Sequence, residues 1–215
     1  MVDAEAVELA MFPLESALLP DEDLPLRIFE PRYTALVADC MRTSDPQFGV
    51  VLISRGREVG GGDARCDVGA LAEITECTEL GSGRYALRCR MRERIRVCEW
   101  LPDDPYPRAL ARVWPDEPGA SVTDGQLSEL EERVLALFER IAGARGVALP
   151  SREVLLGSSD AADPGARLYA LASRVPIGQA DRYAVLSAPS AAERLAALDE
   201  AVETVAAMIE FQLSD

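Results

Sequence analysis

Residues 24–33 read Leu24-Pro25-Leu26-Arg27-Ile28-Phe29-Glu30-Pro31-Arg32-Tyr33, and they join an extended run to a helix. Pro31 suits the first helical position, because its fixed φ is already helical and the N–H that it lacks is not needed there. We expect this helix to continue to about Arg42. The apolar residues that share one of its faces, at spacings of three and four, are Tyr33, Leu36, Val37 and Cys40.

Short strands are predicted on both sides of this helix. Leu9–Leu14 and Phe48–Ile53 are β-prone runs, and the second is followed by three consecutive glycines, Gly60, Gly61 and Gly62. A phosphate-binding loop would continue with Lys and Ser or Thr, and neither follows. We therefore predict a surface loop at the triple glycine.

Two longer strands are predicted over Val68–Thr78 and Arg84–Trp100, joined by the tight sequence Gly81-Ser82-Gly83. The second strand alternates between apolar and basic side chains. Its apolar residues on odd positions are Tyr85, Leu87, Cys89, Met91, Ile95 and Val97. Its arginines on even positions are Arg88, Arg90, Arg92, Arg94 and Arg96. A two-residue period places all five arginines on one face.

Two interpretations of this arginine face stay open. Arg88, Arg90 and Arg92 could form an anion-binding face for phosphate or for acidic peptide segments. Alternatively, the arginines lie on a solvated face and pair across the sheet with nearby acids, namely Glu73, Glu76 and Glu79.

After about Pro118 the sequence changes from Pro- and Gly-punctuated runs to Ala-, Leu- and Glu-rich helical spacing. We predict a β-rich domain over residues 1–118 and a helical bundle over residues 119–215. Thr123 with Gln126, and Ser190 with Glu193, have the spacing of capping boxes at the start of two long helices. Shorter helices are predicted between them over Arg167–Val175 and Gln179–Leu186.

Composition excludes most enzyme chemistry. The 215 residues include 22 Arg, no Lys and no His, against 37 Asp and Glu, which gives a net charge of −15. Without His and Lys the chain has no neutral-pH imidazole base, no P-loop lysine and no Ser-Lys dyad. The negative charge also disfavours nucleic acid and anionic membranes as partners.

The five cysteines form no C-x-x-C pair and are odd in number, so reduced thiols are the simplest reading. We expect neither a metal nor a cofactor. Met1–Ala10 has no positively charged leader pattern, and no apolar run approaches the roughly 18 residues of a membrane span. A cytoplasmic protein is expected.

These motifs, in this order, resemble the N-terminal, substrate-binding domain of Lon proteases. The segments that carry the resemblance are Phe12-Pro13-Leu14, residues 24–33, residues 48–53, residues 68–74, Gly83-Arg84-Tyr85, residues 94–97 and Ser190–Leu195. The resemblance implies an α+β fold, with a PUA-like β pseudo-barrel followed by a helical bundle. Two positions depart from the family: Met91 stands where glycine is usual, and Glu15-Ser16-Ala17 replaces a Pro-Gly turn.

The resemblance also implies a non-catalytic module that binds polypeptide substrates or a partner protein, such as a protease or a chaperone. Arg27, Phe29, Arg32 and Tyr33 are the peptide-binding residues that we predict. The architectural alternative is that Ile28 and Phe29 seal the barrel and that Glu30 caps the helix, where its charge suits the helix dipole.

Two other functions stay open. A PUA-like barrel with an arginine face could bind RNA or a small anionic ligand, against the net charge. An enzyme would depend on the acids Glu99, Asp103 and Asp104 near Trp100 and Tyr106, which otherwise form an acidic turn. The sequence leaves the oligomeric state open.

Overall fold

The computed structural model describes residues 5–56, 64–157 and 163–214. The chain divides into two compact units, Met1–Pro115 and Asp116–Asp215. The division predicted after residue 118 lies three residues further along the chain. The triple-glycine loop predicted at residues 60–62 lies outside the described residues.

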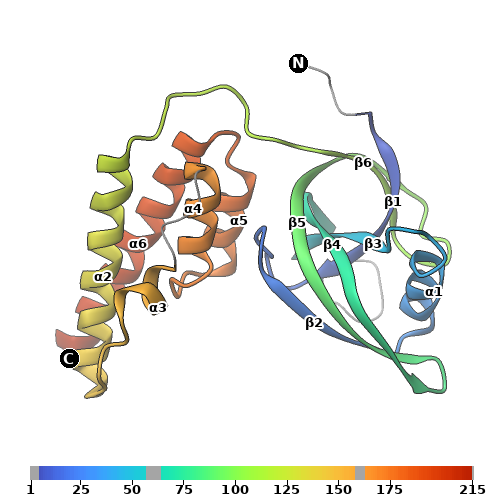
Figure 1. The fold of residues 1–215 in the computed structure, drawn as a ribbon, viewed down its shortest axis with the longest axis horizontal. Helices are drawn as coiled ribbons and strands as arrows, with labels where there is room; N and C mark the ends of the chain where they lie inside the picture. Colours follow the sequence, from blue (N-terminus) through green and yellow to red (C-terminus); the bar gives the residue numbers. More distant parts are fainter. Residues whose placement is uncertain (1–4, 57–63, 158–162, 215) are drawn as a thin grey trace. The chain divides into compact units, whose positions relative to one another are not determined.

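The first unit is a six-stranded mixed sheet with one covering helix, α1 (Figure 1). Its elements are β1 (Val7–Leu14), β2 (Asp23–Ile28), α1 (Pro31–Cys40), β3 (Gln47–Arg55), β4 (Ala64–Gly81), β5 (Arg84–Leu101) and β6 (Arg108–Val113). Strands β1, β3, β4, β5 and β6 pair in a closed ring, because β6 hydrogen-bonds to both β5 and β1. The predicted pseudo-barrel is this ring.

Strand β2 lies outside the ring. It pairs antiparallel with the N-terminal half of β5, from Tyr85 to Arg90, whereas the C-terminal half of β5 pairs with β6. Strands β4 and β5 are joined at a tight turn in which Ser82 and Gly83 both have positive φ, as a type I′ turn requires. The predicted hairpin is confirmed.

A bulge in β5 reverses the side-chain alternation that the sequence suggests. Between the pairs Ala70–Arg94 and Ala72–Met91, β4 advances by two residues and β5 by three. The extra residue turns the side chains of residues 94–97 to the opposite face, up to a second irregularity between Val97 and Glu99. The prediction of five arginines on one face is therefore wrong. The bulge lies directly after Met91, the position at which the sequence comparison left the local geometry open.

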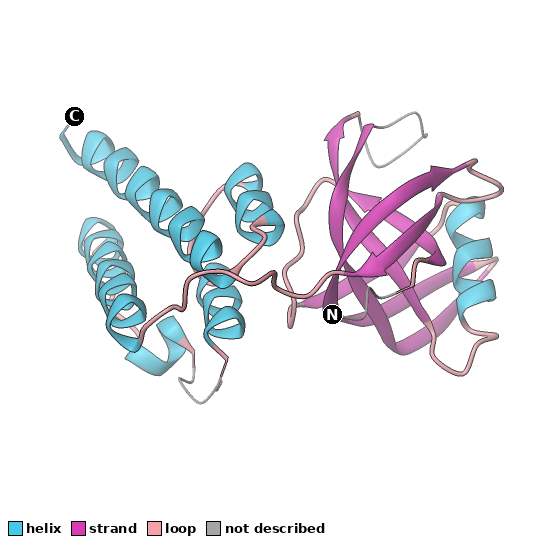
Figure 2. Cartoon of the chain, turned by 90° about the horizontal axis from the view of Figure 1, so that it is seen from above, coloured by secondary structure: helices cyan, strands magenta, loops and turns pink. Residues whose placement is uncertain are grey.

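The two faces of the sheet carry separate cores. One core contains Leu87, Cys89 and Met91, together with the buried side chains of α1, and the other contains Ile95 and Val97. The helix α1 buries Tyr33, Leu36, Val37 and Cys40, which is the predicted set. Its position against the strands is visible in both Figure 1 and Figure 2.

The second unit is helical, which confirms the α+β class. Its elements are α2 (Asp124–Arg145), α3 (Arg152–Leu156), α4 (Pro164–Ala172), α5 (Gln179–Ser187) and α6 (Ala191–Ser214). Thr123 and Gln126 form the predicted capping box, and Gly146 ends α2 in the left-handed conformation. The backbone N–H of Glu193 donates to the Ser190 hydroxyl at the start of α6 (3.3 Å). None of the described helices has the length and apolar character to cross a membrane.

Candidate functional site

The segment between β2 and α1 exposes a large aromatic side chain. Ile28 points inward and is buried, and Phe29, the next residue, is 63% exposed. The expectation that Ile28 seals the barrel is confirmed, and the same expectation for Phe29 is wrong. Successive residues leaving a strand point to opposite faces, so Phe29 lies on the side away from the core that contains Ile28.

Glu30 occupies the position before α1 with extended backbone, yet its side chain makes no capping hydrogen bond. Its carboxylate instead accepts a hydrogen bond from Nε of Arg32 (3.2 Å). The Arg32 guanidinium in turn lies 4.5 Å from the ring centroid of Tyr33. The predicted Glu30 side-chain cap is wrong, because the carboxylate is engaged by Arg32.

A pocket of about 210 Å³, which we call the inner pocket, lies beside this segment. Its lining residues come from β1, β2 and the start of α1: Phe12, Leu14, Pro25, Leu26, Arg27, Ile28, Phe29, Glu30 and Tyr33. Tyr33 is buried, and its ring stacks on Phe12 with centroids 4.1 Å apart. The aromatic wall of the pocket is therefore held in place before any ligand arrives.

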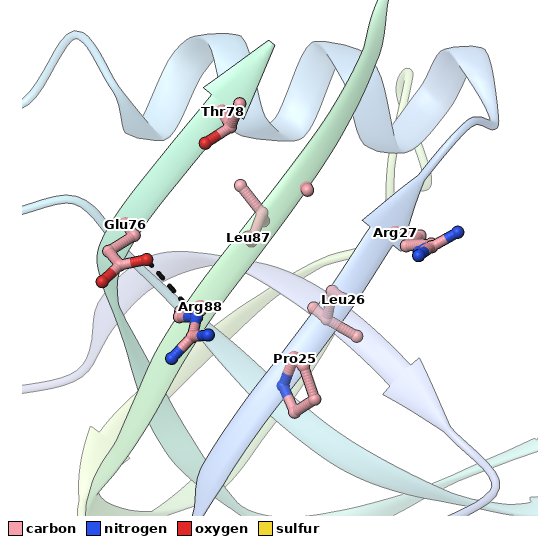
Figure 3. Close-up of a pocket in the computed structure, with 8 residues that line it drawn as sticks. Pro25, Leu26, Arg27, Glu76, Thr78, Leu87 and Arg88 are labelled. Carbon is pink, nitrogen blue, oxygen red and sulfur yellow. Dashed lines mark ion pairs between the residues drawn. The ribbon is translucent and has the colours of Figure 1, made fainter. Parts of the chain in front are cut away.

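A second pocket, the outer groove, has a volume of about 430 Å³ and crosses β4, β5 and β2 (Figure 3). Its lining residues are Pro25, Leu26, Arg27, Glu76, Thr78, Ala86, Leu87 and Arg88. Arg88 and Glu76, both exposed, form an ion pair of 3.4 Å across it. Pro25, Leu26 and Arg27 line both pockets, so β2 forms the border between them.

The structure brings together three of the four predicted peptide-binding residues. Arg27, Phe29 and Tyr33 line the inner pocket, and Arg32 packs against Tyr33 as its support. Sequence reasoning missed Pro25 and Leu26, which contribute to both pockets. Pro25 carried a usable signal, because proline within a strand is typical of a sheet edge.

The arginines of the predicted anion-binding face are all paired with carboxylates. Arg88 pairs with Glu76, Arg90 with Asp23 (3.0 Å) and Asp21 (3.6 Å), and Arg92 with Glu73. The expectation of cross-sheet pairing with Glu73 and Glu76 is confirmed. These carboxylates occupy the three guanidinium groups that an external phosphate would have to bind.

Arg94 and Arg96 lie on the other face of β5, beyond the bulge. Arg94 is 4% exposed, and its Nε donates to the carbonyl oxygen of Trp114 (2.9 Å). Both guanidinium groups stack on the Trp114 ring, 4.0 Å and 3.6 Å from its centroid. These two arginines therefore fix the end of the barrel unit.

Of the acids considered for catalysis, Asp103 is engaged in an ion pair. Asp103 pairs with Arg65 (2.6 Å), and the Tyr106 hydroxyl donates to Asp39 (2.8 Å). Burial, followed by the hydrogen bond to Asp39, raises the pKa of Tyr106 to about 12. Within residues 5–56, 64–157 and 163–214, no group of three or more Asp, Glu or Cys side chains could hold a metal ion.

The cysteines are free thiols, and two of them are buried in the barrel core. Burial raises the pKa of Cys89 to about 12 and that of Cys40 to about 11. Thiols with such high pKa values carry almost no thiolate at neutral pH, so these two cysteines act as core residues.

The second unit has an apolar pocket of about 250 Å³ between the C-terminal halves of α2 and α6. Its lining residues are Ile141, Ala144, Arg145, Pro176, Val205, Met208, Ile209 and Gln212. Met208 and Phe211 are exposed on this part of α6. It is a second surface on which another chain could pack.

Comparison with known proteins identifies relatives that share this architecture. The family model of the ATP-dependent protease La (LON) substrate-binding domain matches residues 8–203. Lon protease 1 of Herpetosiphon aurantiacus is 28% identical over 203 residues, which cover 90% of this chain and 24% of that protein. Lon protease 2 of Myxococcus xanthus is 27% identical over 143 residues, 63% of this chain and 17% of that protein. The chain thus spans a quarter or less of these relatives.

Two solved structures have the same fold. A Lon N-terminal domain protein from Xanthomonas campestris superposes with a TM-score of 0.64 at 25% identity, covering 89% of this chain and 96% of that one. The N-terminal domain of a Mycobacterium avium complex Lon protease superposes with a TM-score of 0.63 at 15% identity, covering 92% and 98%. The second likeness bears on the fold alone.

Proposed function

This chain belongs to the family of Lon substrate-binding domains, and we propose that it binds unfolded or partner polypeptides at the surface formed by β2 and the start of α1. The family gives the general role of a substrate-binding module. The location of the site and the kind of polypeptide are our proposal.

The observation that carries this proposal is Phe29, an exposed aromatic side chain beside a preformed pocket. Exposed aromatics next to pockets often dominate binding energy, because their rings bury much apolar area at little cost in side-chain entropy. Phe12 and Tyr33 form a rigid wall, so little conformational freedom is lost when a ligand side chain enters.

We propose further that the chain works without catalysis, as an adaptor for a protease or a chaperone in the cytoplasm. The absence of Lys and His from the sequence supports a role in binding rather than chemistry. The free thiols are consistent with a reducing compartment. The peptidase activity of the full-length Lon relatives is not part of this proposal.

The experiment compares two exposed apolar side chains of the barrel unit. Phe29→Ala removes the proposed contact, and Leu80→Ala removes a side chain that is 51% exposed near the β4–β5 turn. The probe is reduced, carboxymethylated α-lactalbumin, with binding followed by fluorescence anisotropy. We expect Phe29→Ala to weaken binding about tenfold and Leu80→Ala to change it less than about twofold. The proposal would be wrong if the unmodified protein did not bind the probe, or if both variants lost affinity equally.

A further inference from the structure

We propose that the polypeptide binds by adding a strand to the free edge of β2, and that the favoured segment alternates apolar with acidic side chains. This inference rests on the proposed function and specifies its geometry and its preferred substrate. Three observations on the described residues support it: β2 pairs along one edge alone, it borders two pockets, and its Arg27 has no carboxylate partner among those residues.

The first observation is the edge itself. Among the residues that the structure describes, β2 pairs with β5 and with no other strand. Unpaired backbone N–H and C=O groups at such an edge are a template for another extended chain. Pro25 lies in this strand, at the kind of position where a missing N–H is tolerated.

The orientation of β5 shows which backbone groups face the free edge. Arg88 is paired in register with Pro25, and its carbonyl oxygen accepts a hydrogen bond from the Thr75 hydroxyl on β4 (2.9 Å). In an antiparallel ladder the N–H and C=O of one residue point to the same side, so those of Arg88 point to β4. The backbone of Pro25 then points away from β5, and so does that of Arg27, two residues on. Arg27 therefore offers both an N–H and a C=O at the free edge.

The second observation is that β2 forms the border between the two pockets and that its side chains alternate between exposed and buried positions. Arg27, Ala86 and Thr78 form one cross-strand row of the outer groove, and Pro25, Arg88 and Glu76 form another. The intervening residues of β2, Leu26 and Ile28, line the inner pocket with Phe12, Leu14 and Tyr33, and Leu26 also borders the outer groove. Successive side chains of an added strand point to alternate faces, so they would meet the two pockets in turn.

The third observation is the difference in chemistry between the pockets. The inner pocket is lined by Arg27 and Glu30 and otherwise by apolar and aromatic residues, among them Phe12, Leu14, Phe29 and Tyr33, which favour an apolar ligand side chain. In the outer groove Arg88 is paired with Glu76, whereas no carboxylate of the described residues pairs with Arg27. An acidic side chain on the outer face of an added strand would supply that partner.

Two substitutions of Arg27 distinguish the contribution of its backbone N–H to binding from that of its charge. Arg27→Pro removes the N–H at the free edge and the guanidinium, in a strand that already contains one proline. Arg27→Gln removes the guanidinium and keeps the N–H. The probes are fluorescein-labelled eight-residue peptides in which valine alternates with glutamate or with lysine, and a scrambled valine–glutamate peptide of the same composition.

We expect the unmodified protein to bind the valine–glutamate peptide at least tenfold more tightly than the scrambled and the lysine peptides. Arg27→Gln should reduce affinity about threefold and narrow the difference between the glutamate and lysine peptides. Arg27→Pro should reduce affinity at least tenfold below Arg27→Gln. Urea unfolding of both variants checks that the barrel unit is intact.

Hydrogen exchange of the unmodified protein gives an independent measurement that does not depend on any variant folding. The Arg27 amide should exchange at least tenfold more slowly when the valine–glutamate peptide is bound, while the amides of β3 should not change. An unchanged Arg27 amide in the peptide complex would overturn strand addition, as would full affinity in a folded Arg27→Pro variant.

These outcomes are distinct from failure of the proposed function. If unfolded α-lactalbumin binds and the Arg27 amide stays unprotected, polypeptide binding holds and strand addition is wrong. If neither α-lactalbumin nor the peptides bind, the proposed function itself fails. Protection of the Arg27 amide at high protein concentration without peptide, together with dimers in sedimentation, would assign the edge to a second copy of the chain and overturn the inference.

Discussion

The two halves of strand β5 look alike in sequence and serve different purposes in the fold. The C-terminal half, beyond the bulge, closes the ring with β6 and buries Arg94 against Trp114. The N-terminal half keeps Arg88, Arg90 and Arg92 in surface ion pairs and pairs with β2, whose other edge is unpaired among the described residues. Because the strands of the closed ring have no unpaired edge, another chain cannot pair with them. It could pair with β2, next to the N-terminal half of β5.

The comparison also shows how position decides what an arginine contributes. A guanidinium in a surface ion pair contributes little to the free energy of unfolding, because water and salt screen its attraction to the carboxylate. A buried guanidinium that is hydrogen-bonded and stacked cannot be removed without leaving its partners unsatisfied. Four predictions test this contrast, in order of decreasing expected effect.

The largest effect is expected from adding one methyl group on β4, opposite the C-terminal half of β5 that closes the ring. Gly69 is opposite Ile95, and a Cβ there would lie 2.0 Å from the carbonyl oxygen of Val50. Gly69→Ala should destabilise the protein by about 3 kcal/mol or more, because backbone rather than a flexible side chain must move. The control is Gly81→Ala at the β4–β5 turn, which meets nothing within 4 Å and whose φ of +82° costs about 1 kcal/mol. Urea denaturation measures the free energy of unfolding of both variants. Equal losses of stability would contradict the expected difference between the two positions.

The second prediction concerns the buried arginine. Arg94→Met should lower the free energy of unfolding by about 2–3 kcal/mol, because the carbonyl of Trp114 loses its donor and the stacking is lost. Arg92→Met, on the exposed side of the bulge, should cost about 0–1 kcal/mol. Chemical denaturation at low and high salt distinguishes them, since only the Arg92 variant should have a salt-dependent cost.

The third prediction concerns the pH dependence of stability and the core that contains Leu87 and Cys89. Burial raises the pKa of Cys89 from 9.0 to about 12, so between these values the unfolded state loses a proton that the folded state keeps. The stabilising contribution of the buried thiol is therefore fully present below pH 9 and is lost as the pH rises towards 12; between pH 9 and pH 10 the loss is up to about 1.4 kcal/mol. Cys89→Ala should reduce that slope by about one proton. Leu87→Val, which opens space in the same core without removing a thiol, should keep it.

The smallest effect is expected at the free edge. Arg27→Gln should change the free energy of unfolding by less than about 0.5 kcal/mol, because the side chain is exposed and contributes to no core. A loss of 2 kcal/mol or more would show that Arg27 is part of the fold. It would then be a poor reporter of binding at β2.

The helices were largely predictable from the sequence. The spacing of Tyr33, Leu36, Val37 and Cys40, the Pro31 start and the Thr123–Gln126 box each correspond to an observed feature. These signals lie within a few residues of one another, and local spacing determines them. The short strand β6 and the short helix α3 gave no comparable pattern and were not predicted.

The candidate site was predictable only in part. The sequence predicts Arg27, Phe29 and Tyr33 as site residues. The exposure of Phe29 and the border formed by Pro25 and Leu26 depend instead on how β1, β2 and α1 meet. Those contacts join positions that are well separated along the chain. No spacing rule within one segment could supply them.

By itself, the amino-acid sequence determined the fold class, the family, the start of each long helix and the absence of imidazole and lysine chemistry, because each depends on composition or on nearby residues. Only the tertiary structure decided which β5 arginines form surface ion pairs and which pack against Trp114, and that one edge of β2 stays unpaired. A single extra residue in β5 reverses its faces, and the bulge is defined only by the pairing with β4. An edge is likewise a property of the whole sheet, since it exists where no other strand pairs.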